Sequence, residues 1–147
     1  MITDIIGLFL FIAGFVIGLG AATVIDIHGF LGRKSSYWTE ATTRTHKVTK
    51  PLIWLGMFLA IIWGTIFYRN EGLSQIPQIQ LILAAVLILN GIFLSFRVSQ
   101  FLLAKEKEGR AGELISSAWQ KKITVSFIVS IVGWWVSLLL LIIYLVG

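Results

Sequence analysis

Four long apolar stretches constrain this chain more than any other feature of its sequence. They cover about residues 5–27, 52–68, 78–103 and 123–146, and each approaches the roughly 20 residues that a helix needs to cross a membrane. Of the 147 residues, 57% are hydrophobic and only 13% are charged, against roughly 25% in a soluble domain. Such a chain has too little polar surface for a soluble globule. The sequence therefore predicts an all-α, four-helix transmembrane bundle that forms a single integral membrane domain over residues 1–147.

Basic residues are concentrated in two segments, 28–50 and 104–122, which we expect to be loops between spans. These segments hold ten of the twelve lysines and arginines. By the positive-inside rule both loops face the cytoplasm and both termini face outward, as in a multi-pass protein of the cell (inner) membrane. Because the net charge of +5 lies beside apolar spans, it indicates the lipid bilayer as partner and argues against nucleic acid.

Small residues recur every three or four positions on three of the predicted spans. Such stripes let two helices approach closely, so we expect tight packing within the chain, and the same stripes suit a homo-oligomer. Trp134 and Trp135 lie near the middle of the fourth span, and at least one of them should point inward. The stripes consist of Gly14, Gly18 and Ala22; of Gly56, Ala60 and Gly64; and of Ser126, Ser130, Gly133 and Ser137.

Both halves of the chain share one plan: a span, a long basic segment and a second span. Aligning Gly20 with Gly91 places Asp26 opposite Arg97, which favours a parallel repeat of two helical hairpins. Within the second basic segment, the spacing of apolar residues over 114–119 predicts a short helix on the membrane surface. In the first segment, the polar run before Pro51 can begin the next helix early.

Three polar residues in the predicted spans form a candidate site for a ligand or an ion. Asp26 and Arg97 lie near the cytoplasmic ends of their spans, where an ionisable side chain still costs free energy. They can form a paired site on a proton or ion path, or a structural salt bridge, or Arg97 can extend to the headgroups. Asn90 lies near mid-membrane, where it either hydrogen-bonds across helices or lines a site.

The two histidines, His28 and His46, are both expected close to the cytoplasmic interface. Neutral imidazole is a common metal ligand, so this pair can hold a haem iron or a metal ion; the alternative is two solvated side chains. The absence of cysteine excludes thiolate metal sites and cysteine nucleophiles. No P-loop, HExxH or nucleophile-elbow pattern occurs, which favours a role other than that of an enzyme.

Two stretches carry a resemblance to known membrane proteins: GLGAATVIDIHGFLGRKS, residues 18–35, and THKVTKPLIWLG, residues 45–56. They look like parts of small bacterial four-span proteins of unassigned function. In its plan the chain is also similar to membrane domains of the copper-resistance D type and to the four-span protoporphyrinogen oxidase bundle. These resemblances imply a short helical bundle, in some members with a histidine-based metal or haem site. The oxidase pattern places a histidine and a lysine inside the membrane, and this sequence departs from it, so no catalytic residue is carried over.

Three functions follow from these features. The first is a small membrane protein that binds or transports a small ion or ligand at a polar site near the cytoplasmic side, built from Asp26, Asn90 and Arg97. The second is a haem or metal redox protein that uses His28 and His46. The third is a structural or accessory membrane subunit whose basic loops bind a partner or anionic headgroups. A small four-span drug exporter is disfavoured, because such exporters use a glutamate in the first span and no predicted span contains one.

Overall fold

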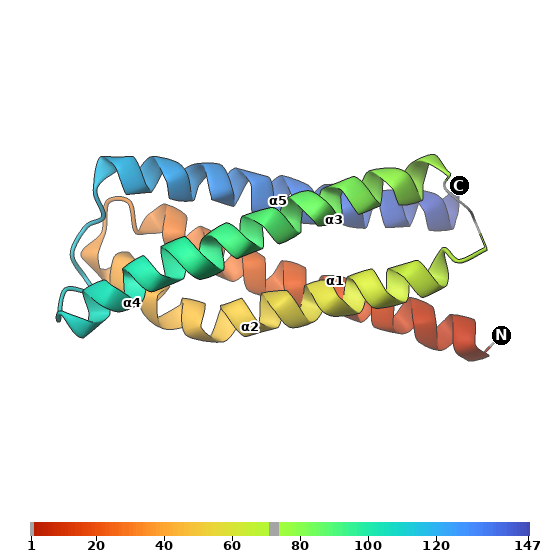
Figure 1. The fold of residues 1–147 in the computed structure, drawn as a ribbon, viewed down its shortest axis with the longest axis horizontal. Coiled ribbons are helices and arrows are strands. Elements are labelled where there is room, and N and C mark those ends of the chain that lie inside the picture. Colours follow the sequence, from red (N-terminus) through yellow and green to blue (C-terminus); the bar gives the residue numbers. More distant parts are fainter. Residues whose placement is uncertain (1, 71–73) are drawn as a thin grey trace.

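The computed structural model describes residues 2–70 and 74–147, which form one elongated bundle of long helices (Figure 1). Within the described residues there is no strand, and four helical segments are long and apolar enough to cross a membrane. These two observations confirm the predicted all-α class and the four candidate spans. The elements are α1 (Ile2–Leu31), α2 (Ser36–Phe67), α3 (Gln75–Phe93), a π-helical turn η1 (Leu94–Val98) that continues directly into α4 (Ser99–Lys107), and α5 (Ser117–Val146).

The two ends of the bundle differ in what they contain. Both chain termini lie at one end, which we call the terminal end (Figure 1). The connections at residues 32–35 and 108–116 lie at the opposite end, which we call the loop end. The basic segments of the sequence are therefore gathered at the loop end.

The first connection is much shorter than the loop expected over residues 28–50. Only residues 32–35 lie outside the helices, because α2 begins at Ser36, about four turns before the apolar part of the segment. The side chain of Ser35 caps this start by accepting a hydrogen bond from the backbone N–H of Trp38 at 3.4 Å. Hydropathy reports which part of a helix prefers lipid, and it does not report where the helix begins.

The second basic segment is also largely helical. Helix α4 runs to Lys107 and α5 begins at Ser117, so residues 104–107 and 117–122 belong to helices that continue into spans, and only 108–116 form a connection. The separate surface helix predicted over 114–119 is therefore wrong. Its first two residues lie in an irregular connection, and its remaining apolar residues form the first turn of α5.

Helices α1 and α2 pack backbone to backbone along their stripes of small residues. A Cβ atom built on Gly14 would lie 2.6 Å from the amide nitrogen of Ala60 and 2.8 Å from the carbonyl oxygen of Gly56. A Cβ atom on Gly56 would overlap the backbone of Gly18. The close approach predicted from the glycine spacing is thereby confirmed, and any side chain at these positions would force the two helices apart.

The apolar core occupies the middle and the terminal half of the bundle. Trp134 is 3% exposed and covers Gly18, whereas Trp135 is 51% exposed, which confirms that one of the pair points inward. Helix α3 contributes only Leu87 to this core, because it lies against α5 and diverges from α2 towards the terminal end (Figure 1). The core cluster comprises Phe11, Phe15, Leu19, Ala22, Met57, Leu87, Trp134 and Leu141.

Most buried polar side chains lie in the loop-end half of the bundle, on the parts of the helices that extend beyond the apolar core. This division of the bundle into an apolar half and a polar half positions the candidate site. The buried polar residues of this half are Asp26, Thr39, Thr43, His46, Thr49, Ser95, Ser99, Lys105, Ser126 and Ser130.

Candidate functional site

A cavity of about 110 Å³ lies between the helices in the loop-end half of the bundle. Its wall is mostly apolar but includes charged and hydroxyl side chains, and we call it the polar cavity after these. All six helical elements, α1, α2, α3, η1, α4 and α5, contribute residues to its wall. This volume has room for several water molecules or for one small ligand. The polar and charged residues of its wall are Asp26, Arg33, Thr39, Thr42, His46, Thr49, Lys50, Ser95, Ser99 and Gln120.

Asp26 supplies the carboxyl group of this cavity. It continues the small-residue stripe of α1 one turn beyond Ala22, and like that stripe it is buried, with 9% of its surface exposed. The carboxyl group interacts with the hydroxyl of Ser130 on α5. Its second oxygen, Oδ2, accepts no hydrogen bond from any residue that the structure describes. One carboxylate oxygen is therefore left to a partner in the cavity.

His46 contributes an imidazole ring whose neutral tautomer is fixed by its neighbours. Its Nδ1 atom lies 2.6 Å from the carbonyl oxygen of Thr43, and because a carbonyl only accepts, Nδ1 carries the proton. Its Nε2 atom lies 3.1 Å from Oγ of Ser99 and accepts that hydroxyl proton. A proton taken up by the ring would therefore bind at Nε2, on the side of α4.

The π-helical turn η1 presents two serines to α2. Ser95 Oγ accepts a hydrogen bond from Nε1 of Trp54 at 3.0 Å, and Ser99, just after η1, bonds to His46. Residues 94–98 are wider than an α-helical turn, and such π-turns occur frequently at functional sites. The two bonds hold this turn against the cavity.

Threonines of α2 line the cavity with oxygen lone pairs more than with donors. The hydroxyls of Thr42 and Thr49 donate to the carbonyl oxygen four residues earlier, over 2.8 and 3.2 Å. The hydroxyl of Thr39 donates to the carbonyl oxygens of Gly32, at 2.7 Å, and Ser35, at 2.9 Å. Because backbone carbonyls take these protons, the free lone pairs of the hydroxyls are the groups left for a ligand. The same bonds satisfy the hydroxyls locally and allow a polar run to remain helical.

Two cations also belong to the cavity wall, Arg33 at the loop end and Lys50 about four turns along α2. The guanidinium of Arg33 is held partly away from the cavity by Phe30. Its Nε donates to the carbonyl oxygen of Phe30, and its central carbon lies 3.8 Å from the centre of the Phe30 ring. Gln120 holds this part of the wall by donating from Nε2 to the carbonyl oxygens of Ile115, at 2.8 Å, and Arg33, at 3.1 Å. The second cation, Lys50, lines the cavity from α2.

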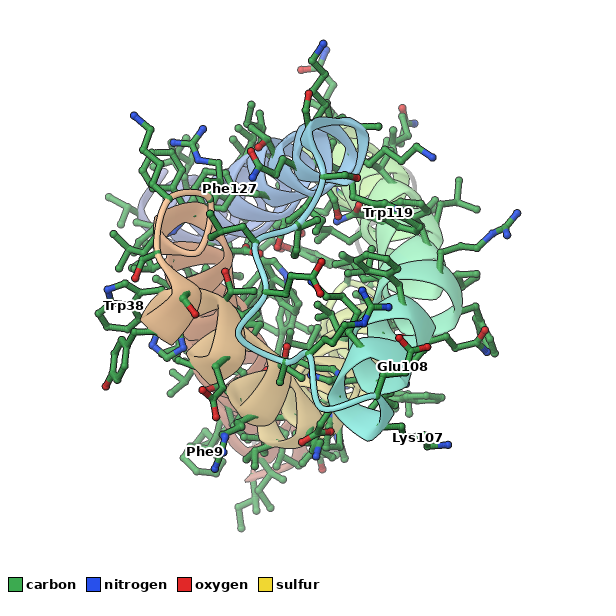
Figure 2. All side chains as sticks on the ribbon, turned by 90° about the vertical axis from the view of Figure 1, so that its left-hand side faces the viewer. Phe9, Trp38, Lys107, Glu108, Trp119 and Phe127 are labelled. Atoms are coloured by element: carbon green, nitrogen blue, oxygen red, sulfur yellow. The ribbon has the colours of Figure 1, made fainter. Side chains whose placement is uncertain are left out.

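The connection at residues 108–116 crosses the loop end of the bundle (Figure 2). Ser36 Oγ donates to the carbonyl oxygen of Gly112 at 2.5 Å, and Nζ of the buried Lys105 donates to the carbonyl oxygen of Glu113 at the same distance. These bonds tie the connection to α2 and to α4. The connection therefore covers the loop end next to the cavity.

The residues predicted as one ligand site do not come together. Arg97 lies on the exposed side of η1, does not line the cavity, and forms no ion pair with Asp26 among the described residues. Asn90 joins α3 to α5: its Nδ2 donates to the carbonyl oxygen of Ser126 at 3.1 Å, and its Oδ1 accepts from Ser126 Oγ at 2.6 Å. Only Asp26 of the three therefore belongs to the polar cavity.

The two histidines are likewise separated by their surroundings. His46 lines the cavity, whereas His28 does not. The ring of His28 packs 5.1 Å from the ring of Trp38. The Nδ1 atom of His28 is buried and forms no hydrogen bond within the described part of the chain. No group of three or more His, Cys, Asp or Glu side chains is placed to hold a metal ion in the residues described. A metal bound at His46 would have to replace the bonds that both ring nitrogens make.

Sequence reasoning did not find the serines and threonines of the cavity. Their spacing does carry a signal: Thr39, Thr42, His46 and Thr49 follow one another at intervals of three or four, which places them on one helical face. Ser95 and Ser99 have the same spacing. Comparisons with protein-family models, with curated proteins and with solved structures gave no match. The inference of function therefore depends on the geometry of the polar cavity.

Proposed function

We propose that this chain is a multi-pass protein of the cell (inner) membrane that binds a small cation in the polar cavity and passes it towards the cytoplasm, the proton being the simplest such cation. The observation that carries the proposal is the buried carboxyl group of Asp26, whose Oδ2 accepts no hydrogen bond from the described residues and which lines the cavity. Asp26 would hold the cation, and His46 would serve as a second proton acceptor.

Burial explains why Asp26 needs a partner. An ionised carboxylate that is removed from water is costly unless it is paired or hydrogen-bonded, and the serine at its other side does not neutralise its charge. A proton or a metal cation at Oδ2 would remove this cost. Carboxylate and hydroxyl oxygens, which Asp26 and the serines and threonines contribute to the otherwise apolar cavity wall, are the ligands that hard cations prefer.

The other charged groups of the wall limit how much positive charge the cavity takes. Arg33 and Lys50 face it in addition to Asp26 and His46. The single carboxylate of Asp26 can balance at most one bound positive charge, and a second would meet only repulsion from these two fixed cations. The same balance argues against a site for several metal ions.

The orientation that we propose places the loop end in the cytoplasm. The basic segments are gathered there, and the positive-inside rule assigns such an end to the cytoplasmic side. The cavity then lies on the cytoplasmic side, beneath the connection at 108–116. A parallel repeat of the two hairpins stays a prediction, and it would relate the buried Asp26 to the exposed Arg97.

Flux through reconstituted liposomes tests the proposal. Liposomes that contain a pH-sensitive dye receive a potassium diffusion potential, and proton uptake is followed; sodium and potassium uptake are followed with matching dyes. We expect the wild-type chain to pass one of these cations, and Asp26→Asn to abolish the flux. Asp4→Asn is the matched control, because Asp4 lies on the same helix but at the exposed terminal end. No flux above protein-free liposomes, or equal flux in Asp26→Asn, would refute transport.

Infrared difference spectroscopy separates binding from transport. If Asp26 takes up a proton, a carboxyl C=O band will change with pH in the wild-type chain and will be missing in Asp26→Asn. If it takes a metal cation instead, the carboxylate bands will change with that cation at constant pH. A spectrum in which neither change depends on Asp26 would show that the cavity binds no cation at this residue.

A further inference from the structure

A second cavity, of about 410 Å³, lies in the terminal half of the bundle between α2 and α3. Its volume falls within the 300–1,000 Å³ typical of small-molecule sites. At its mouth lie exposed residues of the two helices, Ile61 and Thr65 of α2 and Leu81 of α3, so it opens onto the apolar outer surface of the bundle. Its floor is buried and consists of Phe11, Phe15, Met57, Leu87 and Trp134.

Helix pairing explains why this cavity exists. Close glycine contacts hold α2 against α1, where Gly64 lies under the ring of Phe11. Helix α3 is hydrogen-bonded to α5 instead, through Asn90 and through Gln80, whose Nε2 donates to the carbonyl oxygen of Ser137 at 2.8 Å. Because α2 and α3 belong to different pairs, they diverge towards the terminal end (Figure 1).

Gln80 lines this apolar space and carries one hydrogen-bond acceptor that has no partner among the described residues. Its bond to the carbonyl oxygen of Ser137 fixes which arm of the amide is the nitrogen, since a carbonyl cannot donate. The other arm, Oε1, is buried and accepts no hydrogen bond from the residues that the structure describes. Where helices cross a bilayer, such an acceptor is costly, because hydrocarbon offers no donor.

We propose that this cavity binds a membrane-soluble amphiphile whose apolar body lies on the aromatic floor and whose hydroxyl group donates a hydrogen bond to Oε1 of Gln80. The ligand class is a long-chain alcohol. An ordinary phospholipid acyl chain would fill the same space but has no donor for this oxygen. The site shares no residue with the polar cavity, so the two proposals stand independently.

Photo-crosslinking with a matched pair of probes tests this proposal. The full chain, in phosphatidylcholine nanodiscs, is labelled with a long-chain alcohol that carries a diazirine, or with the methyl ether of the same probe. Labelled peptides are then identified by mass spectrometry. We expect the alcohol to label the α2 and α3 residues of the cavity about tenfold more than the ether, the ratio that one hydrogen bond gives. Equal labelling would mean that lipid chains alone fill the space, and would refute the proposal.

Two pairs of variants locate the effect. Gln80→Leu should abolish the preference for the alcohol, whereas Gln75→Leu, an exposed position of the same helix outside the cavity, should retain it. Ala84→Phe should fill the cavity and reduce labelling by both probes, whereas Ala85→Phe points away from it and should not. A preference that persists in Gln80→Leu would refute the assignment of the donor to Oε1. This holds even if Ala84→Phe fails to assemble.

Discussion

Replacement of Gly56 by alanine adds only one methyl group, but it should strongly weaken the pairing of α1 with α2. The added methyl group would overlap the backbone of Gly18 and would lie 2.7 Å from the carbonyl oxygen of Gly14. A flexible side chain could turn aside, but a helix backbone cannot. The two helices would therefore have to separate along the whole stripe, which reduces contact at neighbouring positions as well.

The size of this effect follows from opposing contributions. Overpacking of a close interior costs typically 1–3 kcal/mol, and contact with backbone on two residues places Gly56→Ala near the upper end. Alanine favours a helix over glycine by about 0.5–1 kcal/mol, which offsets part of that cost. We therefore expect a net loss of about 2 kcal/mol in the free energy of unfolding.

Unfolding in mild detergent on titration with SDS, followed by tryptophan fluorescence, measures this loss. Gly20→Ala is the matched control, because a Cβ atom on this glycine of α1 meets no atom within 4 Å. Its stability should stay within about 0.5 kcal/mol of wild type or rise slightly. If Gly56→Ala is as stable as Gly20→Ala, the backbone contact between α1 and α2 is not what holds the hairpin together.

Three further changes test other parts of the structure. A double-mutant cycle between Asn90→Ala and Ser126→Ala, measured by the same unfolding assay, isolates the side-chain hydrogen bond between α3 and α5, because the backbone carbonyl of Ser126 stays in place. It should give a coupling of about 0.6 kcal/mol, as for other hydrogen bonds between membrane helices, and zero coupling would contradict this side-chain bond. Ser99→Ala should lower the free energy of unfolding by about 1–3 kcal/mol, because it leaves Nε2 of the buried His46 without its hydrogen-bond donor. Nitrogen-15 NMR shifts of the His46 ring should report the change, and an unaltered ring spectrum would contradict the contact. Gly109→Ala should lower the free energy of unfolding by about 1 kcal/mol, because Gly109 has φ of 71°, and the cost comes from the backbone alone since a Cβ atom there meets no neighbour. Gly109→Asn should cost less, because asparagine tolerates this conformation better. Equal stability of wild type and both variants would mean that the connection relaxes freely.

Part of the candidate site could be predicted from the sequence. Asp26 continues the small-residue stripe of α1 at the same four-residue spacing, so its burial follows from the periodicity of a regular helix. Asn90 and Arg97 are seven residues apart, so a regular α-helix would place both side chains on one face. The π-turn at 94–98 breaks that register, because each extra residue turns the following side chains by about 100°. Arg97 consequently lies on the exposed side of the turn.

The serines and threonines of the polar cavity could not be assigned to a site from the chain alone. Thr49 and Ser99 are both short side chains that occur on many membrane helices as local hydrogen-bond donors. What makes them a site is that α2 and the segment after η1 face the same space, and that His46 bonds across it. Such contacts join residues far apart in the chain, and no local pattern records them.

The sequence by itself determined the class of this protein, its four apolar helices, the small-residue stripes that allow close helix packing, and the place of Asp26 on the stripe of α1. These properties depend on composition and on spacing along one helix, which are local. Only the tertiary structure decided that α3 pairs with α5 and diverges from α2, that η1 interrupts the register, and that two separate cavities result. Those outcomes depend on which helix faces meet, and this is set by the packing of all the helices at once, so no single segment contains the information.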